Sequence, residues 1–239
     1  MALLDLQGLD SRADQIRHQR RSLPELAKIA ALSQRHAELD AARRDAQIVV
    51  DDLGAEQRKV DADVEQVKAR RTRDQDRIDQ GLITNPKDLE RMQGELESLA
   101  RRINTLEDEE LEVMARLEDA ERDLDGFTTE QAAAAESLAE LEAARDEKTA
   151  ALDTELSGLE SQRAAAAEGI PADLLALYER LREQKNGVGA ALLRARQCSG
   201  CQLSVDAAEL AQIRAAAEDE VVRCEECQRI LVRTSESGL

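Results

Sequence analysis

The sequence predicts a mainly α-helical chain, in which a long antiparallel coiled-coil hairpin precedes a small β-rich domain at the C-terminus. Charged residues make up 35% of the 239 residues and aromatic residues only 1%, a composition typical of long helices and coiled coils. Apolar residues also recur in steps of three and four over residues 89–159. The main polar interruptions of this seam are Glu110, Gln131, Arg145 and Lys148. Such a repeat keeps one apolar stripe facing a partner helix.

A second and weaker heptad pattern covers residues 3–80. Within it, Pro24 marks a point where either a new helix starts or one helix kinks. Polar side chains interrupt its seam at Arg43, Gln57 and Arg71. Each of the two patterns is therefore expected to bury its stripe against another helix.

Helix-ending and helix-starting signals separate the two patterns. Gly81 suits a left-handed C-terminal cap, and Asn85 followed by Pro86 is typical of an N-cap with proline at the first helical position. So short a connection favours antiparallel neighbours, with the tip at residues 81–86 and residue numbers that sum to about 167 side by side. The alternative is one continuous helix that dimerises with a second chain, and the break at the tip argues against it.

Three parts are predicted along the chain. Residues 1–169 form the hairpin, residues 170–187 form a short connecting helix, and residues 188–239 form the β-rich domain. The connecting helix carries an apolar face that is expected to pack on the base of the hairpin. This face consists of Leu174, Leu175, Tyr178 and Leu181.

Four cysteines lie in the C-terminal part, as two Cys-x-x-Cys pairs separated by 22 residues. The metal ligands they predict are Cys198, Cys201, Cys224 and Cys227. Two such turns complete the tetrahedral four-sulfur shell that zinc accepts. The segment has no aromatic residue with which to build a core, so one structural zinc ion is expected to stabilise it, as in a zinc ribbon. The alternative is a redox pair or unrelated thiols.

Local patterns predict the elements of this ribbon. Residues 188–196 have strand character, as do residues 220–223 and 228–233. A helix is expected between the cysteine pairs at residues 204–217, with Ser204 as its N-cap.

The net charge of -18 is concentrated on the second arm, where residues 81–169 hold 24 acidic and 9 basic side chains. This acidity makes the arm a poor partner for phosphate backbones. No apolar run approaches the roughly 20 residues needed to cross a bilayer, and the N-terminus lacks the features of a signal peptide. We therefore expect a cytoplasmic protein without membrane contact, in which thiols stay reduced.

Motifs of common enzymes are absent from the sequence. It contains no phosphate-binding glycine loop, no Gly-x-Ser-x-Gly and no Cys/His nucleophile arrangement. His18 and His36 lie on the first arm, where a solvated or seam histidine is the default. A zinc ion held by four cysteines also leaves no coordination position for water. The sequence therefore predicts a protein that is not an enzyme.

A known family pattern is matched over nearly the whole chain. The matching segments are residues 84–90, 106–114 and 170–182, together with the two cysteine pairs. On these segments the chain resembles the bacterial C4-type zinc ribbon domain proteins with an N-terminal coiled-coil hairpin. The resemblance implies a non-enzymatic role, and some members are tied to flagellar or type III export and to sigma-factor or RNA binding. Gln228 stands where the family usually has glycine, and Gln202 where histidine is common. The first departure is expected to strain the second cysteine knuckle, because glycine usually supplies the positive φ there.

Two functions fit these features. The first is an adaptor or scaffold that binds a protein partner through the coiled coil and its tip, and a protein or nucleic acid through the ribbon. The second is a nucleic-acid-binding regulatory protein that acts through arginines of the ribbon. These are Arg194, Arg196, Arg223, Arg229 and Arg233. Strand alternation puts Arg194 and Arg196 on one face, whereas the competing interpretation pairs the arginines with nearby acids such as Glu220, Glu225 and Glu226.

Overall fold

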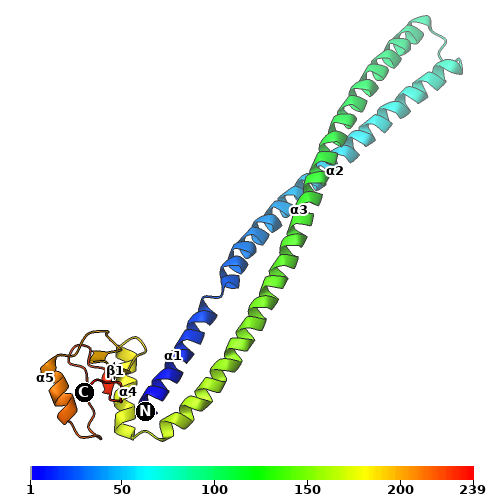
Figure 1. The fold of residues 1–239 in the computed structure, drawn as a ribbon. Helices are drawn as coiled ribbons and strands as arrows, with labels where there is room; N and C mark the ends of the chain where they lie inside the picture. The colour runs from blue at the N-terminus through cyan, green and yellow to red at the C-terminus, as the bar shows by residue number, and fades with distance from the viewer. Residues whose placement is uncertain (1) are drawn as a thin grey trace. The chain divides into compact units, whose positions relative to one another are not determined.

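The computed structural model describes residues 2–239, and within them the chain forms five α-helices and three short strands. It divides into two compact units (Figure 1). The first unit combines residues 1–27 with residues 142–239, and the second consists of residues 28–141. Helices α2 (Pro24–Asp79) and α3 (Pro86–Glu168) contribute residues to both units.

The second unit is an antiparallel helical hairpin, in which α2 and α3 lie side by side (Figure 1). Ion pairs connect the two arms: Arg35 lies 3.0 Å from Glu130, and Lys68 lies 2.8 Å from Glu107. The apolar seam includes Leu39, Leu53, Val64, Ile103, Leu106, Val113 and Ala134, which are all buried. The predicted hairpin is confirmed, and the continuous helix that was its alternative is wrong.

The turn of the hairpin follows the capping signals in the sequence. Gly81 has a φ of 66°, in the left-handed region where glycine carries no steric penalty. The side-chain oxygen of Asn85 accepts a hydrogen bond of 3.0 Å from the backbone N–H of Lys87. Helix α3 then begins at Pro86, whose missing N–H costs nothing in the first helical turn.

Pro24 begins a new helix. Two residues separate the end of helix α1 (Ala2–Arg21) from the start of α2. The hydroxyl of Ser22 donates a 2.8 Å hydrogen bond to the carbonyl of His18, which satisfies one of the free carbonyls at this helix end. The first arm is therefore two consecutive helices.

The first unit holds an apolar cluster that joins four elements. It packs α1, the C-terminal end of α3, the connecting helix α4 (Ala172–Gln184) and two strands of the ribbon. The buried members are Leu3, Leu6, Ile170, Tyr178, Leu181, Ala190 and Ile230. Leu174 and Leu175 pack against it from the edge, so the predicted apolar face of the connecting helix meets the base of the hairpin.

The ribbon is built on a small mixed sheet with the strand order β2-β1-β3. Strand β1 (Ala190–Arg194) pairs antiparallel with β2 (Gln197–Cys198) and parallel with β3 (Ile230–Val232). The predicted strand at residues 220–223 is reduced to one isolated bridge between Arg223 and Ile230.

The helix between the cysteine pairs is shorter than predicted. Helix α5 spans Ala207–Ala215, and its N-cap is Asp206, whose side chain accepts a 2.8 Å hydrogen bond from the backbone N–H of Glu209. The prediction of Ser204 as the N-cap was wrong, because Ser204 instead forms a β-bridge with Gln197. A serine and an aspartate two residues apart both suit this position, and local sequence does not distinguish them.

Candidate metal centre

The four cysteine sulfurs converge at one point of the ribbon. All four lie within 4.8 Å of one another, with 3.8 Å between the sulfurs of Cys198 and Cys227 and 3.9 Å between those of Cys201 and Cys224. A tetrahedron with metal–sulfur bonds of about 2.3 Å has sulfur–sulfur edges of about 3.8 Å. The donor set and the spacing therefore fit one zinc ion.

Both cysteine turns depend on a residue in the left-handed conformation. The backbone N–H of Gln202 donates to the carbonyl of Cys198, and that of Gln228 donates to Cys224, each at 2.8 Å. Gln202 has a φ of 62° and Gln228 a φ of 63°. Each turn therefore places a residue with a Cβ where glycine would be unstrained.

Glycine is instead required inside the first turn, at Gly200. A Cβ built there would lie 2.6 Å from Cδ of Arg229 and 3.0 Å from Cβ of Ala191. The missing side chain lets Arg229 cross the first cysteine turn on its way to the base of the ribbon.

Burial and hydrogen bonding shift the cysteine pKa values in opposite directions. Burial raises the pKa of Cys198, and it raises the pKa of Cys224 to about 12. At Cys227 the opposing effect of burial is outweighed by hydrogen bonds from Arg229, Cys224 and Cys201, and the pKa falls to about 7. Since zinc binds thiolates, a bound cation would supply the charge that deprotonates the buried pair, with release of protons.

Glu209 connects helix α5 to the second cysteine turn, a role that the sequence analysis missed. Its side chain is 6% exposed and accepts a 3.0 Å hydrogen bond from the backbone N–H of Glu225. An apolar cluster surrounds the sulfur atoms from the other sides. Its buried members besides the cysteines are Ala191, Leu193, Val205, Ile213 and Leu231.

Four of the five predicted contact arginines, all but Arg194, donate to backbone carbonyls within the ribbon and its connection to α4. Arg229 donates to Val188 at 2.9 Å and to Lys185 at 3.0 Å. Arg233 donates to the carbonyl of Ala216 at 2.7 Å, at the end of α5, and Arg223 donates to Gln228 at 3.0 Å. These guanidinium groups tie the ribbon together.

Arg194 and Arg196 do not share a strand face, so that prediction was wrong. Strand β1 ends at Arg194, and Arg196 lies in the following turn with a φ of 64°. Arg194 forms an exposed ion pair of 3.1 Å with Glu236, and Arg196 donates to the carbonyl of Gly238 at 3.0 Å. Among the described residues, the arginine partners are thus carbonyls and Glu236 rather than the three acids that the sequence suggested.

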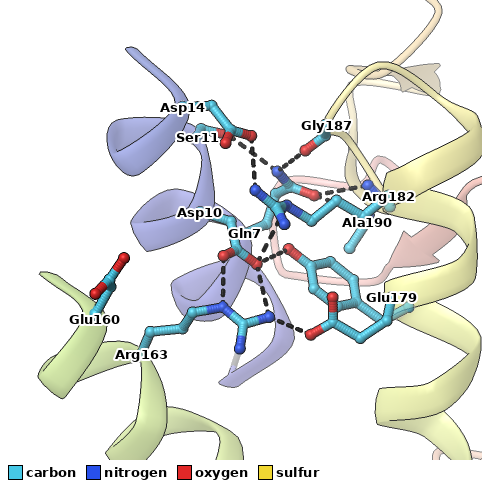
Figure 2. Close-up of polar contacts among 12 residues, drawn as sticks. Gln7, Asp10, Ser11, Asp14, Glu160, Arg163, Glu179, Arg182, Gly187 and Ala190 are labelled. Carbon is cyan, nitrogen blue, oxygen red and sulfur yellow. Dashed lines mark hydrogen bonds and ion pairs between the residues drawn. The ribbon is translucent and has the colours of Figure 1, made fainter. Parts of the chain in front are cut away.

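A buried carboxylate organises the base of the first unit, and sequence analysis missed it as well. Asp10 is 2% exposed and accepts hydrogen bonds from the hydroxyl of Tyr178 at 2.7 Å and from Nε of Arg163 at 2.6 Å. Nε of Arg182 lies 3.5 Å away, and Arg163 also reaches Glu179. Figure 2 shows side chains of α1, α3 and α4 meeting at this carboxylate.

Burial and hydrogen bonding shift the pKa values of two members of this network upward. Burial, and next the hydrogen bond to Asp10, raise the pKa of Tyr178. The hydrogen bond to Asp10 raises the pKa of the Arg163 guanidinium. Asp10 therefore stays paired with protonated partners across the neutral range.

Gln7 connects helix α1 directly to the start of the ribbon (Figure 2). Its side-chain nitrogen donates to the carbonyl of Gly187 at 2.9 Å, and its side-chain oxygen accepts from the N–H groups of Gly189 and Ala190. Gly189 leaves no room for a Cβ, which would lie 2.6 Å from the carbonyl oxygen of Tyr178. The ribbon thus docks on α1 and α4 through backbone groups as well as through apolar contacts.

Two family models match the chain, and together they cover most of it. Residues 6–186 match a CT398-like coiled coil hairpin domain, and residues 197–231 match a C4-type zinc ribbon domain. The second match and the convergent cysteines support one structural zinc ion in the ribbon.

Similar proteins come from several bacteria. Uncharacterized protein Rv2229c of Mycobacterium tuberculosis is 34% identical over 97% of this chain and 94% of its own length. A solved structure from Mycobacterium smegmatis is 32% identical and covers 98% of this chain and 96% of its own, with a TM-score of 0.84. The structure of CT398 from Chlamydia trachomatis shares the fold at 19% identity, covering 96% of this chain and 95% of its own, with a TM-score of 0.70. Within residues 2–239, no helix combines the length and apolarity needed to cross a membrane.

Proposed function

Because the chain belongs to the family of CT398-like coiled coil hairpin proteins, here with a C4-type zinc ribbon, we propose that it is a non-enzymatic adaptor. The hairpin binds a protein partner, and the ribbon offers a second surface for a protein or a nucleic acid. The zinc ion has a structural role in this proposal.

The convergence of the four cysteine sulfurs carries the structural part of the proposal. The ligands are Cys198, Cys201, Cys224 and Cys227. Four protein sulfurs complete a tetrahedral shell and leave no position for a substrate or an activated water. We also place the protein in the cytoplasm, where thiols stay reduced and available to the metal.

The exposed apolar side chains of the hairpin support its role in partner binding. Leu82 at the tip is 65% exposed, and Leu111 on α3 is 63% exposed. Asp10 and Arg163 of the first unit are engaged with one another and hold α1 and α3 together. The ribbon also exposes apolar side chains, with Leu203 at 50% and Val221 at 43%, so both surfaces that the proposal assigns to partners carry apolar groups.

Nucleic-acid binding through the ribbon is the alternative, and the arginine contacts give it less support. Arg229 and Arg233 would have to give up hydrogen bonds to backbone carbonyls before they could contact phosphates. Arg194, with 70% of its side chain exposed, is the best placed of the set to reach a phosphate.

Affinity capture from an extract of the source cells, with and without nuclease, tests the proposal. The bait is the full zinc-loaded chain, and Leu82→Ser is a test variant that removes an exposed apolar group at the tip without touching the seam, so weaker capture by it assigns the contact to the tip. The adaptor role predicts nuclease-resistant capture of a protein. If no protein is retained by the zinc-loaded chain, the adaptor role is wrong. Capture that disappears with nuclease, and with Arg194→Ala, would establish the alternative.

A further inference from the structure

The second unit contains an open groove of about 370 Å³ between α2 and α3. Its floor consists of three alanines and the single phenylalanine of the chain. We refer to this feature as the stalk groove, and it is lined by Ala42, Ala46, Ala120, Val49 and Phe127, with Asp45 and Asp123 at its rim.

The stalk groove exists because the coiled-coil seam is underfilled at this level. Buried side chains close the seam on one side of it, at Leu39 and Ala134, and on the other, at Leu53 and Val113. Between these positions no side chain of either arm is fully buried, because alanines are too small to fill the space beside Phe127. An apolar side chain from outside could occupy it and bury the exposed faces of its walls.

Apolar surface also continues outward from the stalk groove. Val49 on its wall is 48% exposed, and the neighbouring Ile48 is 59% exposed. Two large β-branched side chains in succession on a helix, both open to water, are suited to the apolar face of a partner.

The charges around the stalk groove select the kind of partner. Residues 38–52 hold five acidic and two basic side chains, and residues 117–130 hold six acidic and one basic. Within residues 2–239, the rim carboxylates of Asp45 and Asp123 have neither a hydrogen bond nor an ion pair. A second copy of this chain would bring the same negative charges face to face, which disfavours self-association through this surface.

We propose that the stalk groove binds a basic amphipathic helix of a partner protein, with an apolar side chain beside Phe127 and lysine or arginine near Asp45 and Asp123. Helices α2 and α3 satisfy their backbone groups internally, so an extended peptide finds no sheet edge to pair with, whereas a helix needs only side-chain contacts. The inference rests on the proposed function, since it specifies where the hairpin binds a protein and what that protein presents.

A synthetic peptide tests the inference directly. The probe is an amphipathic helix of about 18 residues, or five turns, with leucines on one face, lysines elsewhere and one tryptophan on the apolar face. The chain has no tryptophan, so tryptophan emission reports on the peptide alone. With the full zinc-loaded chain we expect saturable binding and a blue shift. A peptide of the same composition with scrambled leucine positions should bind without the blue shift, and equal shifts for both peptides would overturn the inference.

Matched charge variants separate a specific site from general attraction to an acidic protein. Asp45→Asn with Asp123→Asn removes two charges at the stalk groove, and Asp108→Asn with Glu112→Gln removes two from the outer surface of α3. Two lost ion pairs of about 0.7 kcal/mol each correspond to about tenfold weaker binding. We expect this loss only for the first pair, and an equal loss for both pairs would show non-specific attraction and refute the site.

A filled groove provides the second test. Ala46→Met with Ala120→Leu occupies the space beside Phe127, and it should abolish the blue shift without lowering the melting temperature. Unchanged binding by this variant would refute the inference. If the filled variant still captures the same protein from an extract as the original chain, the stalk groove is not the site while the adaptor role stands. If the original chain captures no protein, the adaptor role itself fails.

Discussion

Replacement of Asp10 by alanine should destabilise the first unit by about 3 kcal/mol. Breaking a buried ion pair by removing one partner costs about 3–5 kcal/mol, because the remaining charge is left buried without compensation. The lower end of this range applies here, since Arg163 keeps Glu179 and Arg182 keeps Asp14 after the carboxylate is lost.

A double-mutant cycle with Tyr178→Phe isolates one hydrogen bond of the network. The phenolic O–H donates to a carboxylate at 2.7 Å, and its removal should cost about 1.5 kcal/mol, as expected for a hydrogen bond to a charged group. In the Asp10→Ala background the hydroxyl has already lost this acceptor, so the same replacement should cost close to nothing. The coupling energy between the two positions is then about 1.5 kcal/mol.

Backbone amide hydrogen exchange of α1 and α4 measures these energies in the relevant unit and in all four members of the cycle. Tyrosine fluorescence cannot follow the Tyr178→Phe variants, because Tyr178 is the single tyrosine and the chain has no tryptophan, whereas helical ellipticity reports on the whole chain. The control is Arg12→Ala, because the ion pair of Arg12 with Glu155 is largely exposed and should contribute less than about 1 kcal/mol. The network does not hold the first unit together if Asp10→Ala costs no more than this control, or if Tyr178→Phe costs the same in both backgrounds.

Four further predictions concern the ribbon and the tyrosine. Chelation of zinc should unfold the ribbon but leave most helical ellipticity, since structural zinc supplies about 10–16 kcal/mol; a ribbon that keeps its amide protection would contradict this. Gln228→Gly should tighten zinc binding by about 1 kcal/mol in chelator competition, by relieving the positive φ, and weaker binding would argue against strain. Arg229→Ala should lower the stability of the ribbon by about 2–3 kcal/mol, whereas Arg194→Ala should lower it by less than about 1 kcal/mol. Similar melting temperatures for the two variants would refute this contrast. The pKa of Tyr178 is raised in the folded chain, so the free energy of unfolding should fall as the pH rises above the unfolded pKa of about 10, by about 1.4 kcal/mol per pH unit. Tyr178→Phe should remove this dependence of the unfolding free energy on pH.

The features that sequence analysis predicted are those set by local chemistry. The turn between the arms follows from Gly81, Asn85 and Pro86. Each of these residues affects only the backbone of the adjacent helical turn. The seam follows from a repeat that any helix of this length must bury. The convergence of the cysteines follows from the geometry of two Cys-x-x-Cys turns, whatever the path between them.

The network around Asp10 was missed because an acidic residue on a helix is most often solvated. A signal was nevertheless present. Gln7 and Asp10 continue the steps of three and four that begin at Leu3 and lead to Ala13, so two polar residues occupy the buried stripe of α1. Their partners lie far along the chain, with Tyr178 at 168 positions from Asp10, and no local pattern names them.

The arginines of the ribbon were misjudged for a different reason. A guanidinium serves equally well as a phosphate ligand and as a donor to backbone carbonyls, and composition does not separate the two uses. The contact of Arg233 with the end of α5 depends on where that helix stops, at Ala215, which the sequence placed two residues too late.

The division of the first unit between residues 1–27 and residues 142–239 sets an order of events during synthesis. Helix α1 leaves the ribosome early, but the elements that cover Leu3 and Leu6 follow more than a hundred residues later. At about 5–20 residues per second, α1 waits roughly 10 s or more with its apolar stripe uncovered. During this interval the hairpin of residues 28–141 can already close from its own contacts and shorten the search of α1 for its neighbours. A chain whose turn at the tip is slow to form should therefore lose yield through aggregation during translation, even where its final stability is unchanged.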